Sequence, residues 1–245
     1  MSSGVLVKET AQGYRGAVSA PVVLVHGWGG SFEATWQRSG FTELLRDAGR
    51  DVIGVDLLGH GTAPKPHDID AYADLTERVL EAMPEDPVDA VGFSLGAMTL
   101  LHIACQQPHR FRKLVLAGIG RNIFERDEAA TAAIISALEG HGDPDDNIAR
   151  MFLNYANQPG NDLMALTAVM RRVRGAEFSA EVVGRADCPT LVVLGDKDFA
   201  GPADPLMAAL PNATLQVLRN VDHFATPESF GFIDAALGFL DAVPS

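Results

Sequence analysis

The sequence of 245 residues predicts an α/β fold in which a mostly parallel sheet has helices on both faces. Two observations support this prediction. Short, continuous runs of valine, leucine and isoleucine are typical of strands that are buried on both faces. Segments with apolar residues at helical spacing alternate with these runs along most of the chain.

The alternation begins near residue 20 with the run Val22–Val25, which ends at His26 and Gly27. Prolines at positions 84 and 108 stop two of the later helical patterns. The apolar runs predict strands at residues 21–25, 51–55, 88–92, 113–117, 190–194 and 214–218. The helical patterns between them predict core helices at residues 31–48, 71–83, 95–107 and 227–240.

This rhythm breaks between residues 121 and 187, where the sequence contains no convincing strand. Apolar residues recur there at helical spacing, and the patterns cover residues 125–139, 146–156 and 161–173. We therefore expect two parts: a core made of residues 1–120 and 188–245, and a small helical cap insertion made of residues 121–187.

Composition limits the partners and the compartment of the protein. The formal net charge of −13 argues against binding to nucleic acid or to anionic membrane surfaces, because both would repel the chain. We find no apolar run of membrane-spanning length and no signal peptide, so we expect a cytoplasmic protein. Two cysteines indicate neither a disulfide framework nor a metal cluster. We expect a monomer or a homodimer.

One serine lies between two glycines where a predicted strand passes into a predicted helix. The stretch reads Gly92-Phe93-Ser94-Leu95-Gly96. Such a strand-to-helix turn presents its serine at the carboxyl edge of a parallel sheet, where ligands bind. The following helix directs its N-terminal amides at the same place and favours negative charge there. The turn therefore predicts that Ser94 is a nucleophile.

A serine nucleophile needs a base that reaches the same edge of the sheet. His223 follows the predicted strand at 214–218 and precedes the last predicted helix, which places it in a carboxyl-end loop. His102 lies inside the helix after Ser94, and His109 lies at the far end of that helix. We therefore predict that His223 is the base.

The base needs an acid that orients its ring. Asp196 and Asp198 both follow the predicted strand at 190–194. We favour Asp198, because it lies further along the loop and can reach across to an imidazole. Asp222 is adjacent to His223 in sequence, and a direct neighbour rarely has the geometry needed to hold the ring.

The sequence resembles the α/β-hydrolase family, which has the same chain order of serine, acid and histidine. Four separated motifs carry the resemblance: His26-Gly27-Trp28-Gly29-Gly30, Asp56-Leu57-Leu58-Gly59-His60-Gly61, Gly92-Phe93-Ser94-Leu95-Gly96, and Gly195-Asp196-Lys197-Asp198 with Asp222-His223. The resemblance implies that the acid is the last residue of the Gly-x-x-Asp run, which supports Asp198. It also implies an oxyanion hole made by the backbone amides of Leu95 and Trp28.

Large apolar residues of the predicted cap recur at helical spacing, and we expect some of them to roof the site. The predicted substrate pocket is apolar and consists of Trp28, Ile123, Phe124, Met151, Phe152, Tyr155, Met164, Met170 and Phe199. Arg171, Arg172 and Arg174 form a basic cluster that we interpret as a solvated helix end, with an anion site as the alternative.

These features predict a serine hydrolase of small to medium apolar carboxylic esters that uses Ser94, His223 and Asp198 and needs no cofactor or metal. The same three side chains also serve carbon–carbon bond hydrolases, lactonases and thioesterases, so these activities remain alternatives. A non-catalytic binding protein with a hydrolase fold is a third hypothesis, and a broken triad or a sealed pocket would indicate it.

Overall fold

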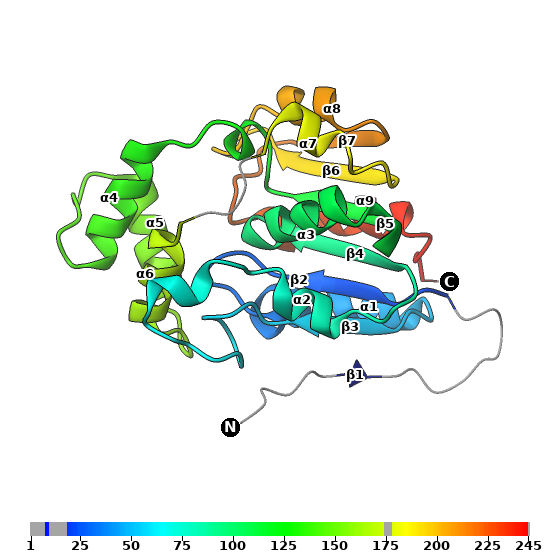
Figure 1. Ribbon diagram of the computed structural model, residues 1–245, viewed down its shortest axis with the longest axis horizontal. Coiled ribbons are helices and arrows are strands. Elements are labelled where there is room, and N and C mark those ends of the chain that lie inside the picture. The colour runs from blue at the N-terminus through cyan, green and yellow to red at the C-terminus, as the bar shows by residue number, and fades with distance from the viewer. Residues whose placement is uncertain (1–7, 10–18, 174–177, 245) are drawn as a thin grey trace.

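A twisted sheet with strand order β1-β3-β2-β4-β5-β6-β7 forms the centre of the protein in the computed structural model, which describes residues 8–9, 19–173 and 178–244 (Figure 1). β1 pairs antiparallel with β3, and every other neighbouring pair is parallel. The strands are β1 (Lys8–Glu9), β2 (Val22–Val25), β3 (Val52–Val55), β4 (Val88–Phe93), β5 (Phe111–Ala117), β6 (Thr190–Gly195) and β7 (Ala213–Leu218).

Successive residues of the central strands face opposite sides of the sheet and enter two different hydrophobic clusters. Val23 and Val25 belong to one cluster, whereas Val22 and Leu24 belong to the other. Helices α2 (Glu77–Ala82) and α3 (Leu95–Gln106) cover the first face, and α1 (Phe41–Asp47) and α9 (Phe230–Phe239) cover the second (Figure 1). Both faces are therefore buried, as the continuous apolar runs predict.

Two of the predicted core helices are interrupted. The predicted helix at 31–48 is split into a π-helical turn, η1 (Glu33–Gln37), and α1, because Gly40 between them adopts a left-handed φ of 77°. The predicted helix at 71–83 is split into a 3₁₀ turn, η2 (Ile69–Tyr72), and α2. There the carboxylate of Asp74 accepts hydrogen bonds from the backbone and the hydroxyl of Thr76, and this local turn competes with the helix.

The segment between β5 and β6, which we call the insertion (residues 121–187), contains helices and no strand within its described residues, 121–173 and 178–187. Its three longest helices, α4 (Glu128–Leu138), α5 (Asn147–Ala156) and α6 (Leu163–Arg171), lie beyond one end of the sheet (Figure 1). Asp127, Asp146 and Asp162 cap the N-termini of these helices through their carboxylates.

The remaining elements are short, and sequence periodicity did not predict them. They are α7 (Ala180–Val183), α8 (Asp204–Ala209), η3 (Pro108–Arg110), η4 (Arg121–Ile123) and η5 (Thr226–Glu228). Across the ranges that the structure describes, no helix has both the length and the apolar character needed to cross a membrane.

Candidate active site

The turn between β4 and α3 holds Ser94 in a backbone conformation that is rare for a residue with a side chain, with φ of 50° and ψ of −111°. The two flanking glycines are required by close packing. A Cβ atom on Gly92 would lie 2.7 Å from the backbone of Ala97, and one on Gly96 would lie 2.3 Å from the carbonyl oxygen of Val25. The glycine spacing therefore allows the sharp turn that presents Ser94.

The imidazole of His223 reaches Ser94 from the loop after β7. Its Nε2 atom lies 2.9 Å from the Ser94 hydroxyl oxygen. The rings of Phe93 and Phe199 flank the imidazole, with centroid distances of 5.0 and 4.3 Å. His223 is almost fully buried, so its ring is held by packing as well as by hydrogen bonds.

The carboxylate of Asp198 contacts the other side of the same ring. The His223 Nδ1 atom lies 2.9 Å from Asp198 Oδ1 and 3.0 Å from Oδ2. The backbone N–H of Ala200 donates a hydrogen bond of 2.8 Å to Asp198 Oδ1 and helps to fix the carboxylate. Asp196 does not reach the ring, because it is exposed and instead accepts a hydrogen bond from the backbone of Asn220.

These contacts form a continuous hydrogen-bonded chain from Ser94 through His223 to Asp198. In this arrangement Nδ1–H donates to the carboxylate and leaves Nε2 free to accept the serine proton. These three side chains can therefore lower the barrier to attack by the serine oxygen on an electrophilic carbon.

The loop of residues 26–30 lies beside Ser94, and the buried imidazole of His26 shapes it. The Leu57 N–H donates to Nε2 of His26 at 3.1 Å, so the proton of the neutral ring must be on Nδ1. Nδ1 then donates to the carbonyl oxygen of Gly27 at 2.7 Å. The backbone N–H of Gly30 donates to the same oxygen at 3.1 Å. The His26 side chain therefore has a structural role, which is to hold the backbone of this loop.

A second buried imidazole, that of His60, packs against His26 with a ring-centroid distance of 5.1 Å. Burial lowers the pKa of His26, which outweighs the opposing effect of the Asp56 carboxylate. Burial also lowers the pKa of His60 to about 3, and the proximity of His26 adds to this effect. Both rings are therefore neutral at pH 7 and do not act as cations in the site.

A cavity of about 230 Å³ opens at Ser94, between the ends of the core strands and the insertion. Four residues of the predicted pocket line it: Trp28, Phe152, Met170 and Phe199. The other lining residues are Ser94, Leu95, Met98, Arg121, Asn122, Glu125, Arg126, Asp127, Ala130, Thr131, Ile134, Ile148 and Arg172. Trp28 and Leu95, the residues with the predicted oxyanion amides, therefore border the same space as the Ser94 side chain.

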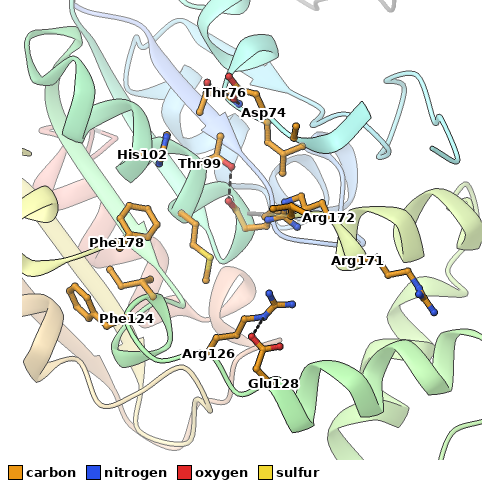
Figure 2. A pocket seen from close by; sticks show the side chains of 16 residues that line it. Asp74, Thr76, Thr99, His102, Phe124, Arg126, Glu128, Arg171, Arg172 and Phe178 are labelled. Carbon is orange, nitrogen blue, oxygen red and sulfur yellow. Dashed lines mark hydrogen bonds and ion pairs between the residues drawn. The ribbon is translucent and has the colours of Figure 1, made fainter. Parts of the chain in front are cut away.

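A larger cavity of about 540 Å³ adjoins the first and shares Leu95, Met98, Arg126 and Arg172 with it (Figure 2). The predicted pocket residues Ile123 and Phe124 line this second cavity and not the one at Ser94. The two spaces together would admit a substrate that extends beyond the reacting carbon.

The other three predicted pocket residues line neither cavity. Met151 and Met164 are 39% and 64% exposed, so their prediction as lining residues was wrong. Met151 immediately precedes Phe152 on α5, and neighbouring residues point in directions about 100° apart around a helix. Tyr155 packs against Gly29 and against Phe224 and leaves the cavity surface to Phe152.

The cavity at Ser94 is more polar than the apolar pocket that the sequence predicted, because Arg121, Arg126 and Arg172 line it. Figure 2 shows the side chains of Arg126 and Arg172 pointing into the shared space, whereas Arg171 borders only the larger cavity and directs its guanidinium away from it, toward Glu139. Arg172 also caps the end of α6, because its Nη1 atom donates to the carbonyl oxygen of Val169 at 2.6 Å, so the anion site stays a prediction. Arg174 lies outside the described residues. Arg171 and Arg172 differ in the direction of their side chains, and the sequence does not indicate that direction.

Comparisons with known proteins agree with this fold. The family model described as "alpha/beta hydrolase fold" matches residues 20–143. A pimeloyl-[acyl-carrier protein] methyl ester esterase of Neisseria meningitidis serogroup C is 38% identical over 229 residues, which cover 82% of this chain and 86% of that protein. A 2-hydroxy-6-oxo-2,4-heptadienoate hydrolase of Pseudomonas putida is 38% identical over 118 residues, and this match covers 46% of this chain and 42% of that protein.

Solved structures with low sequence identity have the same fold. A hydrolase from Pseudomonas aeruginosa superposes with a TM-score of 0.70 at 23% identity, and the match covers 92% of this chain and 91% of that one. A family model that covers half of the chain and a relative matched along most of its length lead to one conclusion: the chain belongs to the α/β-hydrolase family and is a hydrolase of that fold.

Proposed function

We propose that the protein is a serine hydrolase that cleaves small to medium carboxylic esters. The observation that carries the proposal is the series of hydrogen bonds that joins the partly buried Ser94 to the buried His223 and Asp198, with distances of 2.9 to 3.0 Å. These are the distances at which a base can take the proton of a serine hydroxyl and a carboxylate can orient that base.

In the proposed reaction, His223 Nε2 takes the proton of Ser94 while Oγ attacks the carbonyl carbon of the ester. The carbonyl oxygen becomes negative, and the backbone N–H groups of Leu95 and Trp28 stabilise it. The tetrahedral intermediate collapses, and the alcohol leaves with the proton that His223 returns. Water, deprotonated by His223, then attacks the acyl-enzyme and releases the carboxylic acid. The mechanism needs no metal or cofactor.

Asp198 has two roles in this proposal. Its carboxylate keeps the proton of the imidazole on Nδ1, so that Nε2 faces Ser94 as an acceptor. It also stabilises the imidazolium that forms when the serine is deprotonated. Because His223 and Asp198 are both largely buried, water screens this interaction weakly.

The nature of the cavity and one relative support an ester as the substrate. The cavity at Ser94 combines apolar side chains such as Phe152 and Met170 with polar ones, and the adjoining larger cavity leaves room for an extended group. The relative from Neisseria meningitidis is named as a methyl ester esterase and matches this chain along most of its length.

Hydrolysis of a carbon–carbon bond is the second candidate, and two observations favour it. The partial match to a 2-hydroxy-6-oxo-2,4-heptadienoate hydrolase gives a relative with that kind of substrate. Arg126 and Arg172, which line the space next to Ser94, could pair with the carboxylate of such a keto acid.

Turnover of a p-nitrophenyl ester series from acetate to decanoate, with wild type and Ser94→Ala side by side, tests the proposal. Serine-dependent release of p-nitrophenol is the expected result, and the preferred acyl length would then measure the space that the cavities offer. Equal turnover by Ser94→Ala would refute the serine mechanism. A folded wild type that is inactive on every ester but cleaves 2-hydroxy-6-oxo-2,4-heptadienoate would favour the second candidate.

A further inference from the structure

The insertion contacts the loop of residues 26–30 at three points, although 125 or more residues separate the partners in sequence. The indole N–H of Trp28 donates to the carbonyl oxygen of Leu166 on α6 at 3.1 Å. The side-chain amide of Asn161 donates to the carbonyl oxygen of Gly29 at 2.8 Å. The ring of Tyr155 lies so close to Gly29 that a Cβ atom there would be 2.8 Å from Cδ1.

The amide group of Asn161 joins this loop to the last turn of α5. Its Nδ2 atom donates to Gly29 at 2.8 Å and to the carbonyl oxygen of Tyr155 at 3.1 Å. Both partners are acceptors, so the nitrogen of the side-chain amide must face them. One hydrogen bond of the amide therefore reaches the loop, the other anchors the amide to α5, and Asn161 is only partly exposed.

Hydrogen bonds within the loop also fix its backbone, and the Leu57 N–H ties His26 to the core at 3.1 Å. The carbonyl oxygen of Gly27 accepts hydrogen bonds from His26 Nδ1 at 2.7 Å and from the Gly30 N–H at 3.1 Å. This carbonyl and the N–H of Trp28 belong to one planar peptide group, so fixing the oxygen also fixes the direction of the N–H. Two residues further along the loop, the carbonyl oxygen of Gly29 accepts the hydrogen bond from Asn161.

We propose that Asn161 is a positioning residue for the oxyanion hole: its hydrogen bond to Gly29 keeps the Trp28 N–H aimed at the oxygen that becomes negative. The inference rests on the proposed function, because it concerns a donor that acts only in the transition state. Such a donor is effective only within about 2.7–3.1 Å of the developing oxyanion. A displacement of roughly 1 Å can cost about 100-fold in rate. The insertion would thus help to build the catalytic site as well as line the cavity.

Replacement of Asn161 by alanine tests this role through the split between kcat and KM. We expect kcat for a p-nitrophenyl ester to fall about 10- to 100-fold while KM changes less than about threefold, because substrate binding does not use the oxyanion donor. Affinity for an aryl trifluoromethyl ketone, which forms a tetrahedral adduct with the serine, should weaken by a similar factor. Inhibition by the carboxylic acid product should stay near the wild-type value.

His67→Ala is the matched control, because His67 also joins the core to the insertion. Its Nε2 atom lies 2.9 Å from a carboxylate oxygen of Asp162, the neighbour of Asn161, and within the described part of the chain no hydrogen bond joins His67 to the 26–30 loop. We expect this variant to keep the wild-type kcat and ketone affinity. A similar loss in both variants would mean that general loosening of the insertion is responsible, and would overturn the inference.

The outcomes separate this inference from the proposed function. Turnover that depends on Ser94 together with an unchanged kcat in Asn161→Ala would refute the positioning role and leave the function intact. Turnover that is equal in Ser94→Ala and wild type would refute the serine mechanism and, with it, the oxyanion hole. If Asn161→Ala lowers the melting temperature strongly, Asn161→Asp repeats the test with a side chain of similar size that lacks the donor.

Discussion

The carboxyl ends of the core strands and the insertion above them meet at one cavity but build it differently. On the core side, Ser94, Asp198 and His223 each follow a strand, so the sheet itself places them on one edge. On the insertion side, Phe152, Met170 and Arg172 come from α5 and from the end of α6. Their positions depend on how these helices pack.

This difference suggests a division of roles: the core side would carry the chemical step, and the insertion side would select the substrate. The proposed reactive groups are joined by hydrogen bonds of 2.9 to 3.0 Å between side chains that follow β4, β6 and β7. The lining residues are held by ring contacts such as that between Phe152 and Trp28, at a centroid distance of 5.3 Å. We therefore expect substitutions on the core side to change the rate of the chemical step, and most substitutions on the insertion side to change which ester fits.

The largest expected effect distinguishes two carboxylates of the same core loop. Asp198→Asn should lower kcat by roughly 10⁴-fold, because the amide cannot hold the imidazole in the required tautomer. Asp196→Asn is the matched control and should stay within about threefold of wild type, since that residue is exposed and its carboxylate accepts a hydrogen bond from the backbone of Asn220. Steady-state kinetics on one ester measures both, and the reverse ranking would assign the acid to Asp196.

The next effect concerns the buried imidazole of His60 and the pH dependence of the free energy of unfolding. The pKa of His60 is lowered from 6.5 to about 3 in the folded protein, so between these values the unfolded chain binds a proton that the folded protein does not. The contribution of His60 to the free energy of unfolding therefore falls as the pH decreases below 6.5. His60→Gln removes this term and should reduce the loss of stability between pH 7 and pH 5 by about 2 kcal/mol.

Urea unfolding at both pH values measures this difference for wild type and His60→Gln. His109→Gln replaces an exposed histidine and is the control for the exchange of histidine for glutamine. The same pH dependence in His60→Gln and wild type would show that the buried imidazole does not titrate in this range on unfolding.

The smallest of these effects tests the insertion side. Phe152→Ala removes a ring from the cavity at Ser94 and should raise KM for longer esters about 3- to 10-fold, with kcat within about twofold. Met151→Ala changes the adjacent residue, which lines neither cavity, and should leave KM unchanged. Kinetics across the p-nitrophenyl series gives both values, and a loss of kcat without a change in KM would contradict the proposed division of roles.

The sequence predicted the parts of the molecule that depend on local pattern. The strands β2 to β7 follow from continuous apolar runs, and the turn at Ser94 follows from glycines that close packing requires. Ser94, Asp198 and His223 could be brought together from the sequence because the carboxyl ends of parallel strands share one edge. The breaks before α1 and α2 were missed, since Gly40 and Asp74 override a helical pattern of apolar residues.

The insertion was harder to predict, because the roles proposed for its residues depend on the direction of single side chains and on contacts between distant residues. Helical spacing predicted α5 but could not tell that Phe152 faces the cavity while Met151 faces solvent. Arg171 and Arg172 are neighbours in sequence, yet only Arg172 lines the space at Ser94. Asn161 gave no signal at all, because its partner Gly29 lies 132 residues away.

The backbone conformation of Ser94 implies a conflict between the stability of the folded protein and the reactivity proposed for this residue. A φ of 50° with ψ of −111° costs a residue with a side chain roughly 1–3 kcal/mol, and glycine largely avoids this cost. We therefore expect the inactive variant Ser94→Gly to unfold at a higher denaturant concentration than wild type. Selection for thermal stability alone would then favour loss of the proposed nucleophile. A more stable and still active protein would need stabilising substitutions at other positions.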